Sequence, residues 1–148
     1  MHTYTRTVEI AAPIESVFHF HNDPQNLLKI SPPGINVKIE HSEPTALGAK
    51  IILKVSQFGI IKMLWKMQFT EYEPPFRMTD EMLSGPFKTW IQRRELSFKN
   101  GKTFLNDSLD YELPFGFLGN IANALVVKYI IKNMFEYRQR KTKELLEK

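Results

Sequence analysis

The chain has 148 residues, of which 43% are hydrophobic and 24% are charged, with a formal net charge of +4. These proportions are typical of one folded domain with a sizeable core and argue against a disordered chain. The absence of cysteine excludes disulfides and thiolate chemistry and is compatible with the reducing cytoplasm, where we expect the protein to reside. The longest uncharged run, Leu113 to Val127, is shorter than the roughly 20 residues that span a bilayer, so we expect no stable membrane insertion.

Positive charge gathers near the end of the sequence. The basic residues there are Lys128, Lys132, Arg138, Arg140, Lys141, Lys143 and Lys148. They form either a patch for nucleic acid or anionic lipid, or a solvated helix face whose cations suit the negative end of the helix dipole. The cluster is not interleaved with exposed aromatic residues as in proteins that bind single strands, and we expect no nucleic-acid partner.

The first part of the chain predicts a strand, two short helices and a loop. Alternating polar and apolar residues over Thr3–Ile10 indicate a half-buried strand. Pro13 suits the first position of a helix, and Pro24 begins a second helix that reaches about Ile30. Residues 31–34, Ser-Pro-Pro-Gly, cannot continue a helix and therefore form a loop.

From residue 35 to residue 113, apolar residues recur at every second position, which is typical of strands. The alternating segments are 35–39, 51–55, 63–69, 76–82, 87–98 and 103–113. Turn-forming residues separate them at Pro44 to Gly48, Gly59, Pro74-Pro75, Ser84-Gly85-Pro86 and Asn100-Gly101. This order predicts an antiparallel meander of strands.

After residues 114–116, Pro-Phe-Gly, nothing breaks a helix from about Leu118 to Leu146, roughly 29 residues that extend about 43 Å. The part from Ile121 to Ile131 is apolar on almost all sides, so we expect other structure to enclose it. The chain is thus predicted to be a single α+β ligand-binding domain over residues 1–148. A curved antiparallel sheet of about seven strands wraps around the long C-terminal helix, and two short helices lie between strands one and two.

The dipeptide Asn100-Gly101 favours a two-residue hairpin, in which the numbers of paired residues sum to 201. This register places Arg94 opposite Asp107, on the face of the last strand that also carries Leu105 and Leu109. Charges on an apolar face must pair or meet water, because burying either partner alone costs several kcal/mol. The pair is either a structural salt bridge or a polar anchor inside a ligand pocket.

The predicted inner faces combine apolar residues with a few polar ones, as small-molecule pockets do. Taken singly, each apolar residue is explained by core packing. Together they favour a cavity, because a helix that rests on a strongly curved sheet rarely fills the space beneath it. The expected ligand-binding residues are Trp65, Met67, Phe69, Met78, Asp80, Trp90, Gln92, Arg94, Asp107, Leu109, Tyr111 and Leu125.

Several segments, spread in order over nearly the whole chain, carry a family resemblance. They are residues 10–18 (Ile-Ala-Ala-Pro-Ile-Glu-Ser-Val-Phe), 22–24 (Asn-Asp-Pro), 73–76 (Glu-Pro-Pro-Phe), 85–87 (Gly-Pro-Phe) with Trp90, and 110–116 (Asp-Tyr-Glu-Leu-Pro-Phe-Gly). In these the chain resembles the START-like superfamily, also called SRPBCC, in its polyketide cyclase/dehydrase-like branch. The resemblance implies a helix-grip fold with a deep cavity between sheet and C-terminal helix, and lipid-like, polyketide-like or other hydrophobic ligands.

Members of this superfamily bind, transport or sense ligands, and only some catalyse cyclisation or dehydration. Many relatives carry a Trp-x-His-x-His pattern, whereas here Trp90 is followed by Gln92 and Arg94, so the best acid/base candidates are missing. We therefore expect binding of a hydrophobic or amphipathic small molecule (lipid-, isoprenoid- or polyketide-like) and assign no catalytic residue.

Two alternatives stay open. One is a cyclase or dehydratase in which Asp80, Asp107 or Tyr111 acts as acid or base and Arg94 stabilises an enolate. The other is an interaction module that docks the basic end of the helix on a protein or membrane.

The histidines do not suggest a metal site. His19 and His21 lie two apart on a predicted helix and point to nearly opposite sides, so they cannot share a metal, and we expect them at the surface or in a cap. The sequence contains no Gly-rich phosphate loop and no His-Glu-x-x-His motif. We expect neither a metal nor a cofactor.

Overall fold

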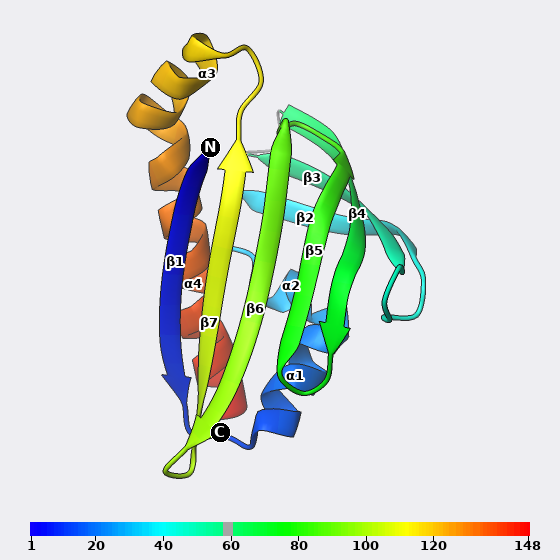
Figure 1. Cartoon of the computed structure of the whole chain (residues 1–148), viewed down its shortest axis with the longest axis vertical. Helices are drawn as coiled ribbons and strands as arrows, with labels where there is room; N and C mark the ends of the chain where they lie inside the picture. Colours follow the sequence, from blue (N-terminus) through cyan, green and yellow to red (C-terminus); the bar gives the residue numbers. More distant parts are fainter. Residues whose placement is uncertain (58–60) are drawn as a thin grey trace.

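The computed structural model describes residues 1–57 and 61–148, which form a curved sheet packed against one long helix (Figure 1). The strands are β1 (His2–Ile10), β2 (Ile35–Ser42), β3 (Lys50–Gln57), β4 (Ile61–Glu73), β5 (Arg77–Ser84), β6 (Thr89–Lys99) and β7 (Lys102–Glu112). The helices are α1 (Ile14–Asn22), α2 (Asn26–Lys29), α3 (Phe117–Ala122), the π-helical turn η1 (Asn123–Val127) and α4 (Lys128–Leu146). The predicted order of elements is confirmed, while the break predicted at Gly59 lies outside the described residues.

The sheet is antiparallel throughout and has the order β1-β7-β6-β5-β4-β3-β2. The first strand pairs with the last, so β1 and β2 form the two edges. Strands β2 and β3 run at a steep angle to β6 and β7, which shows how strongly the sheet bends (Figure 1). The bend gives the sheet a concave side, and α4 runs along it.

The turn between β6 and β7 sets the register of the interior. Asn100 and Gly101 have φ angles of 54° and 77°, in the left-handed region that these two residues tolerate well. As predicted, Arg94 pairs with Asp107 across the two strands. Every second residue of β7 from Thr103 to Tyr111 is buried, so this face of the strand looks inward.

The C-terminal half of α4 is fastened to strand β1 by side chains. The Gln139 amide donates a hydrogen bond to the Arg6 carbonyl at 2.8 Å, and the Lys143 ammonium donates to the Glu9 carbonyl at 2.6 Å. Ile131 and Phe135, one helical turn apart, are buried against the sheet. These contacts fix the C-terminal half of the helix along the edge strand β1.

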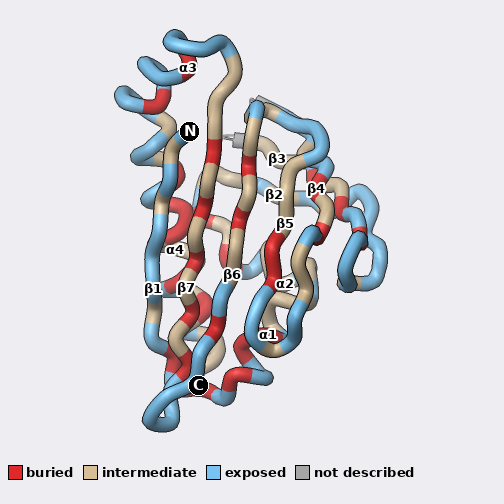
Figure 2. Tube along the Cα trace, viewed as in Figure 1, coloured by how far each residue is buried: buried red, intermediate tan, exposed pale blue. Residues whose placement is uncertain are grey.

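The N-terminal part of the long helix is not enclosed, so the expectation for Ile121 to Ile131 was wrong over most of its length. Ile121, Leu125 and Val126 are exposed, with Leu125 at 70%. The physical reason is that α3 extends beyond the end of the sheet, and that η1 faces the sheet with one side, where Asn123 is buried and accepts a hydrogen bond from Tyr111 (Figures 1 and 2). The helix is also not purely α-helical, because η1 inserts a π turn.

The buried residues form two apolar clusters rather than one. The first gathers around α1 and includes Val17 and Leu105, and the second lies under α4 and includes Trp90 and Leu109. On β7 the residue between Leu105 and Leu109 on the inward face is Asp107. A polar layer therefore crosses the core between the two clusters.

Candidate functional site

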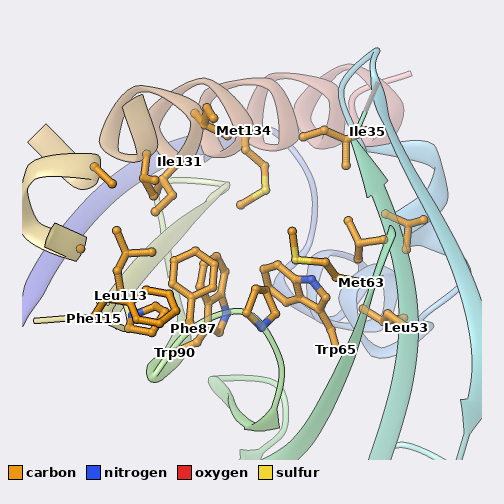
Figure 3. A pocket seen from close by; sticks show the side chains of 18 of the residues that line it. Ile35, Leu53, Met63, Trp65, Phe87, Trp90, Leu113, Phe115, Ile131 and Met134 are labelled. Carbon is orange, nitrogen blue, oxygen red and sulfur yellow. The ribbon is translucent and has the colours of Figure 1, made fainter. Parts of the chain in front are cut away.

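A cavity of about 470 Å³ lies between the sheet and the long helix (Figure 3). Figure 3 shows Ile131 and Met134 pointing into it from the helix. Trp65 and Trp90 face them from the sheet, and Phe87 faces them from the β5–β6 connection. The lining residues come from α2, β2, β3, β4, β6, the β5–β6 and β7–α3 connections, and the final helix. They are Leu27, Ile35, Val37, Leu53, Val55, Met63, Trp65, Pro86, Phe87, Trp90, Leu113, Pro114, Phe115, Leu118, Gly119, Ala122, Val127, Ile130, Ile131, Met134 and Arg138.

One wall of the cavity is aromatic. The ring centroids of Trp65 and Trp90 lie 4.9 Å apart and meet edge to face, and Phe87 lies 4.7 Å from Trp90. Such tilted arrangements bring ring edges against ring faces and add to the stability gained by burying their area. The three rings pack against one another and give this wall an apolar surface.

A group of charged side chains lies next to the cavity, in the polar layer of the core. Arg94 lies 3.2 Å from a carboxylate oxygen of Asp80 and 3.8 Å from one of Asp107, and all three side chains are at most 14% exposed. The Gln139 amide donates a second hydrogen bond to Asp107 at 3.0 Å and so joins the helix to this group. The prediction that Arg94 and Asp107 face the interior together is confirmed.

Burial shifts the proton affinities in this layer. It raises the pKa of the Asp80 carboxyl, and the positive charge of Arg94 opposes that shift. Burial, together with the charge of Arg94, lowers the pKa of Arg138 to about 10, which leaves this side chain protonated at neutral pH.

His21 belongs to the same interior, so the expected surface or capping role was wrong for this residue, whereas His19 is exposed. The His21 Nδ1 donates to the Val17 carbonyl at 3.0 Å, and its ring lines two small voids together with Arg94. Burial, and then the charge of Arg94, lower the pKa of His21 to about 4, so the imidazole is neutral at pH 7.

The structure divides the predicted ligand-binding residues among five places. Trp65 and Trp90 line the large cavity. A neighbouring void of about 80 Å³ is lined by Met67, Phe69, Asp80 and Arg94, and Arg94 also borders a void of about 10 Å³ with Gln92 and Asp107. Met78, Leu109 and Tyr111 are buried in the apolar clusters, and Leu125 is exposed on the projecting helix.

Much of the cavity wall was not among the predicted residues. Ile35, Val37 and Leu53 had been placed on apolar strand faces, but the strand pattern alone does not say which faces surround a void. The sequence predicts Arg138 as part of the basic C-terminal cluster. Arg138 follows Ile131 and Met134 at helical spacing, however, and shares their inward face. That spacing was the signal that could have found it.

Solved structures share this architecture along the whole chain. A protein of Chromobacterium violaceum superimposes with a TM-score of 0.80 at 17% identity, covering 100% of this chain and 99% of that chain. A START superfamily protein of Mycobacterium smegmatis gives 0.74 at 18% identity, covering 99% and 98%. The major latex-like protein of Panax ginseng gives 0.71 at 15% identity, covering 98% and 97%. No protein-family model and no curated protein matches the sequence.

These likenesses establish the fold. The chain has a START-type, or SRPBCC-type, helix-grip fold, as its sequence resemblance implied. Within the described residues, no helix is both long and apolar enough to cross a membrane.

The buried ion pairs of Arg94 lead to a first prediction. We expect Arg94→Met to destabilise the protein by about 3–5 kcal/mol, because it leaves Asp80 and Asp107 buried without their cation. The matched control is Arg93→Met on the opposite face of β6, whose pair with Asp110 is far more exposed and is expected to contribute less than about 1 kcal/mol. Urea unfolding measures both, and equal losses would contradict the prediction.

The lowered pKa of His21 predicts that acid destabilises the folded protein. The unfolded histidine, with a pKa of 6.5, binds a proton more readily than the folded one. The free energy of unfolding is therefore unaffected by the titration of His21 above pH 6.5 and decreases as pH falls toward 4. The change amounts to roughly 3 kcal/mol. We expect the difference in unfolding free energy between wild type and His21→Gln to shrink by about this amount from pH 7 to pH 4. His19→Gln is the exposed control, and a difference that does not vary with pH would refute the assignment.

Proposed function

We propose that this protein binds a hydrophobic or amphipathic small molecule in the cavity between its sheet and its long helix. The observation that carries the proposal is a cavity of about 470 Å³ whose wall is apolar apart from one arginine. Ligand pockets of about 300–1,000 Å³ with mostly apolar walls and few polar groups are typical of small-molecule sites. Lipid-, isoprenoid- and polyketide-like molecules, the classes implied by the START-like resemblance, suit such a wall.

The cyclase alternative receives no specific support from the geometry. Asp80 and Asp107, the proposed acids or bases, are paired with Arg94 in the polar layer and do not line the large cavity. The Tyr111 hydroxyl donates a hydrogen bond to Asn123 at 2.6 Å, at the start of the π turn. These side chains serve the packing of the fold, and we assign them no catalytic role.

The tryptophans give a direct measurement of cavity binding. The chain has two, Trp65 and Trp90, and both line the cavity, so energy transfer from them to the neutral dye N-phenyl-1-naphthylamine reports occupancy there. In Val127→Phe, a phenyl ring on the cavity wall would fill part of the space that the dye occupies. We expect this variant to bind the dye at least about tenfold more weakly, because the dye loses contact area with the wall.

The matched control is Val126→Phe, because Val126 is the neighbouring residue, is exposed, and does not line the cavity. Its dye affinity should equal that of the wild type. Binding that is undiminished in Val127→Phe, or lost to the same extent in both variants, would refute the assignment of the site.

We also propose a second function, docking on an anionic membrane surface, from a separate observation. The segment α3–η1 exposes large apolar side chains where most globular proteins keep them buried, including Phe117 at 72% and Leu125 at 70%. Residues 113–135 contain no acidic residue, and the exposed Lys128 places positive charge beside the apolar surface, which suits anionic lipid. This surface adjoins the cavity wall at Leu118, and a bilayer would both cover it and offer apolar ligands.

Vesicle flotation tests this docking with phosphatidylcholine vesicles that contain or lack phosphatidylglycerol. We expect stronger binding to the anionic vesicles, with Lys128→Gln reducing it by about fivefold because one surface cation contributes about 1 kcal/mol. Leu125→Ser should also weaken it, whereas Phe98→Ser, an exposed apolar residue beside the β6–β7 turn at the opposite end of the sheet, should not. A dimer in sedimentation equilibrium that Leu125→Ser dissociates would instead identify a second copy as the occupant and overturn the proposal.

A further inference from the structure

One charged side chain reaches into the large cavity. Arg138 is the single charged residue among those that line it, and it comes from the inward face of α4. The same side chain borders the small void next to Arg94 and Asp107, so it lies where the apolar cavity meets the polar layer. An apolar guest in the cavity would therefore have one end beside a guanidinium group.

Arg138 differs from its neighbour Arg94 in having no counter-ion at contact distance. Asp80 and Asp107 both lie within 4.0 Å of Arg94, whereas no carboxylate of the described residues comes that close to Arg138. The Arg138 Nε is buried without a hydrogen-bond partner, and its guanidinium lies 5.7 Å from the ring centroid of Phe135. This half-buried cation is compensated only by the more distant carboxylates of Asp107 and Asp80, so a carboxylate from outside the chain would gain free energy by pairing with it.

We propose that the natural ligand is a monoanionic amphipath, a carboxylic acid with an apolar chain or ring system, whose carboxylate pairs with Arg138. This inference rests on the proposed function and names the ligand class of the same cavity. A guanidinium offers a planar fork of donors that matches the two oxygens of a carboxylate. A single negative charge suits the site better than a double one, because the carboxylates of Asp80 and Asp107 lie nearby and would repel further charge.

The orientation of the ligand follows from the lining. The carboxylate meets Arg138 at the boundary with the polar layer, and the apolar body lies along Trp65 and Trp90. The far end of the body then reaches the wall formed by Leu113 and Leu118, next to the exposed helix. Polar anchoring at one end and apolar contact elsewhere is the usual division of roles in small-molecule sites.

The test compares dodecanoate with dodecanol, two guests of equal chain length, by displacement of N-phenyl-1-naphthylamine at a pH where the acid is ionised. We expect the wild type to bind the acid at least about tenfold more tightly than the alcohol, as a charge-assisted pair implies. Arg138→Met should reduce this ratio to near one. Arg140→Met is the matched control, because Arg140 is an exposed arginine on the same helix, and it should keep the wild-type ratio.

The outcomes distinguish failure of the anionic-ligand proposal from failure of cavity binding itself. Equal affinity of the wild type for acid and alcohol, or a ratio that persists in Arg138→Met, would overturn the anionic ligand and leave cavity binding intact. Failure of the dye and both guests to bind would overturn cavity binding itself. Thermal unfolding of the empty protein adds a second measurement: Arg138→Met should unfold no earlier than the wild type, since it removes a half-buried charge whose Nε has no hydrogen-bond partner. A large loss of stability would show that Arg138 instead balances Asp80 and Asp107, and would refute the inference.

Discussion

The ion pairs of Arg94 with Asp80 and Asp107 are the constraint around which the rest of the structure is arranged. They join β5, β6 and β7 at one level of the sheet, and Gln139 extends the same layer to the helix. Because charges so deeply buried tolerate only a narrow geometry, the register of three strands and the height of the helix are set together. Apolar residues are left to pack above and below this level as two separate clusters.

The two clusters serve different ends of the molecule. Around α1, residues such as Val17 and Leu105 are buried completely and fill the space. Under α4 the sheet bends away through β2 and β3, and the side chains that face the helix do not reach across, which leaves the cavity. The exposed segment α3–η1 continues that wall beyond the sheet. The cavity and the exposed apolar segment are thus neighbours, while the polar layer closes the opposite end of the cavity.

Most of the topology and part of the site could be predicted from the sequence. The turn at Asn100-Gly101 and a period of two were enough to place Arg94 opposite Asp107, because both are local rules. The position of the cavity depends instead on how far the sheet curves from the helix, which no local pattern records. For the same reason Leu125 was expected inside: an apolar helix stretch does not reveal where the sheet beside it ends. The sequence does not place Arg138 in the site, because its charge indicates a surface position, although its helical spacing from Ile131 and Met134 puts it on their face.

The attachment of α4 to β1 has a mechanical consequence. Gln139 and Lys143 tie the last turns to the backbone of the edge strand, whereas the other end is held through side chains, by hydrogen bonds from His2 to Asn120 and from Tyr111 to Asn123. Because the large apolar side chains of α3 are mostly exposed and add little packing, local fluctuations are expected to be largest toward Phe117. The cavity wall near Leu118 is therefore expected to deform more easily than the charged end of the cavity at Arg138. Entry and exit of a guest would then leave the charged end undisturbed.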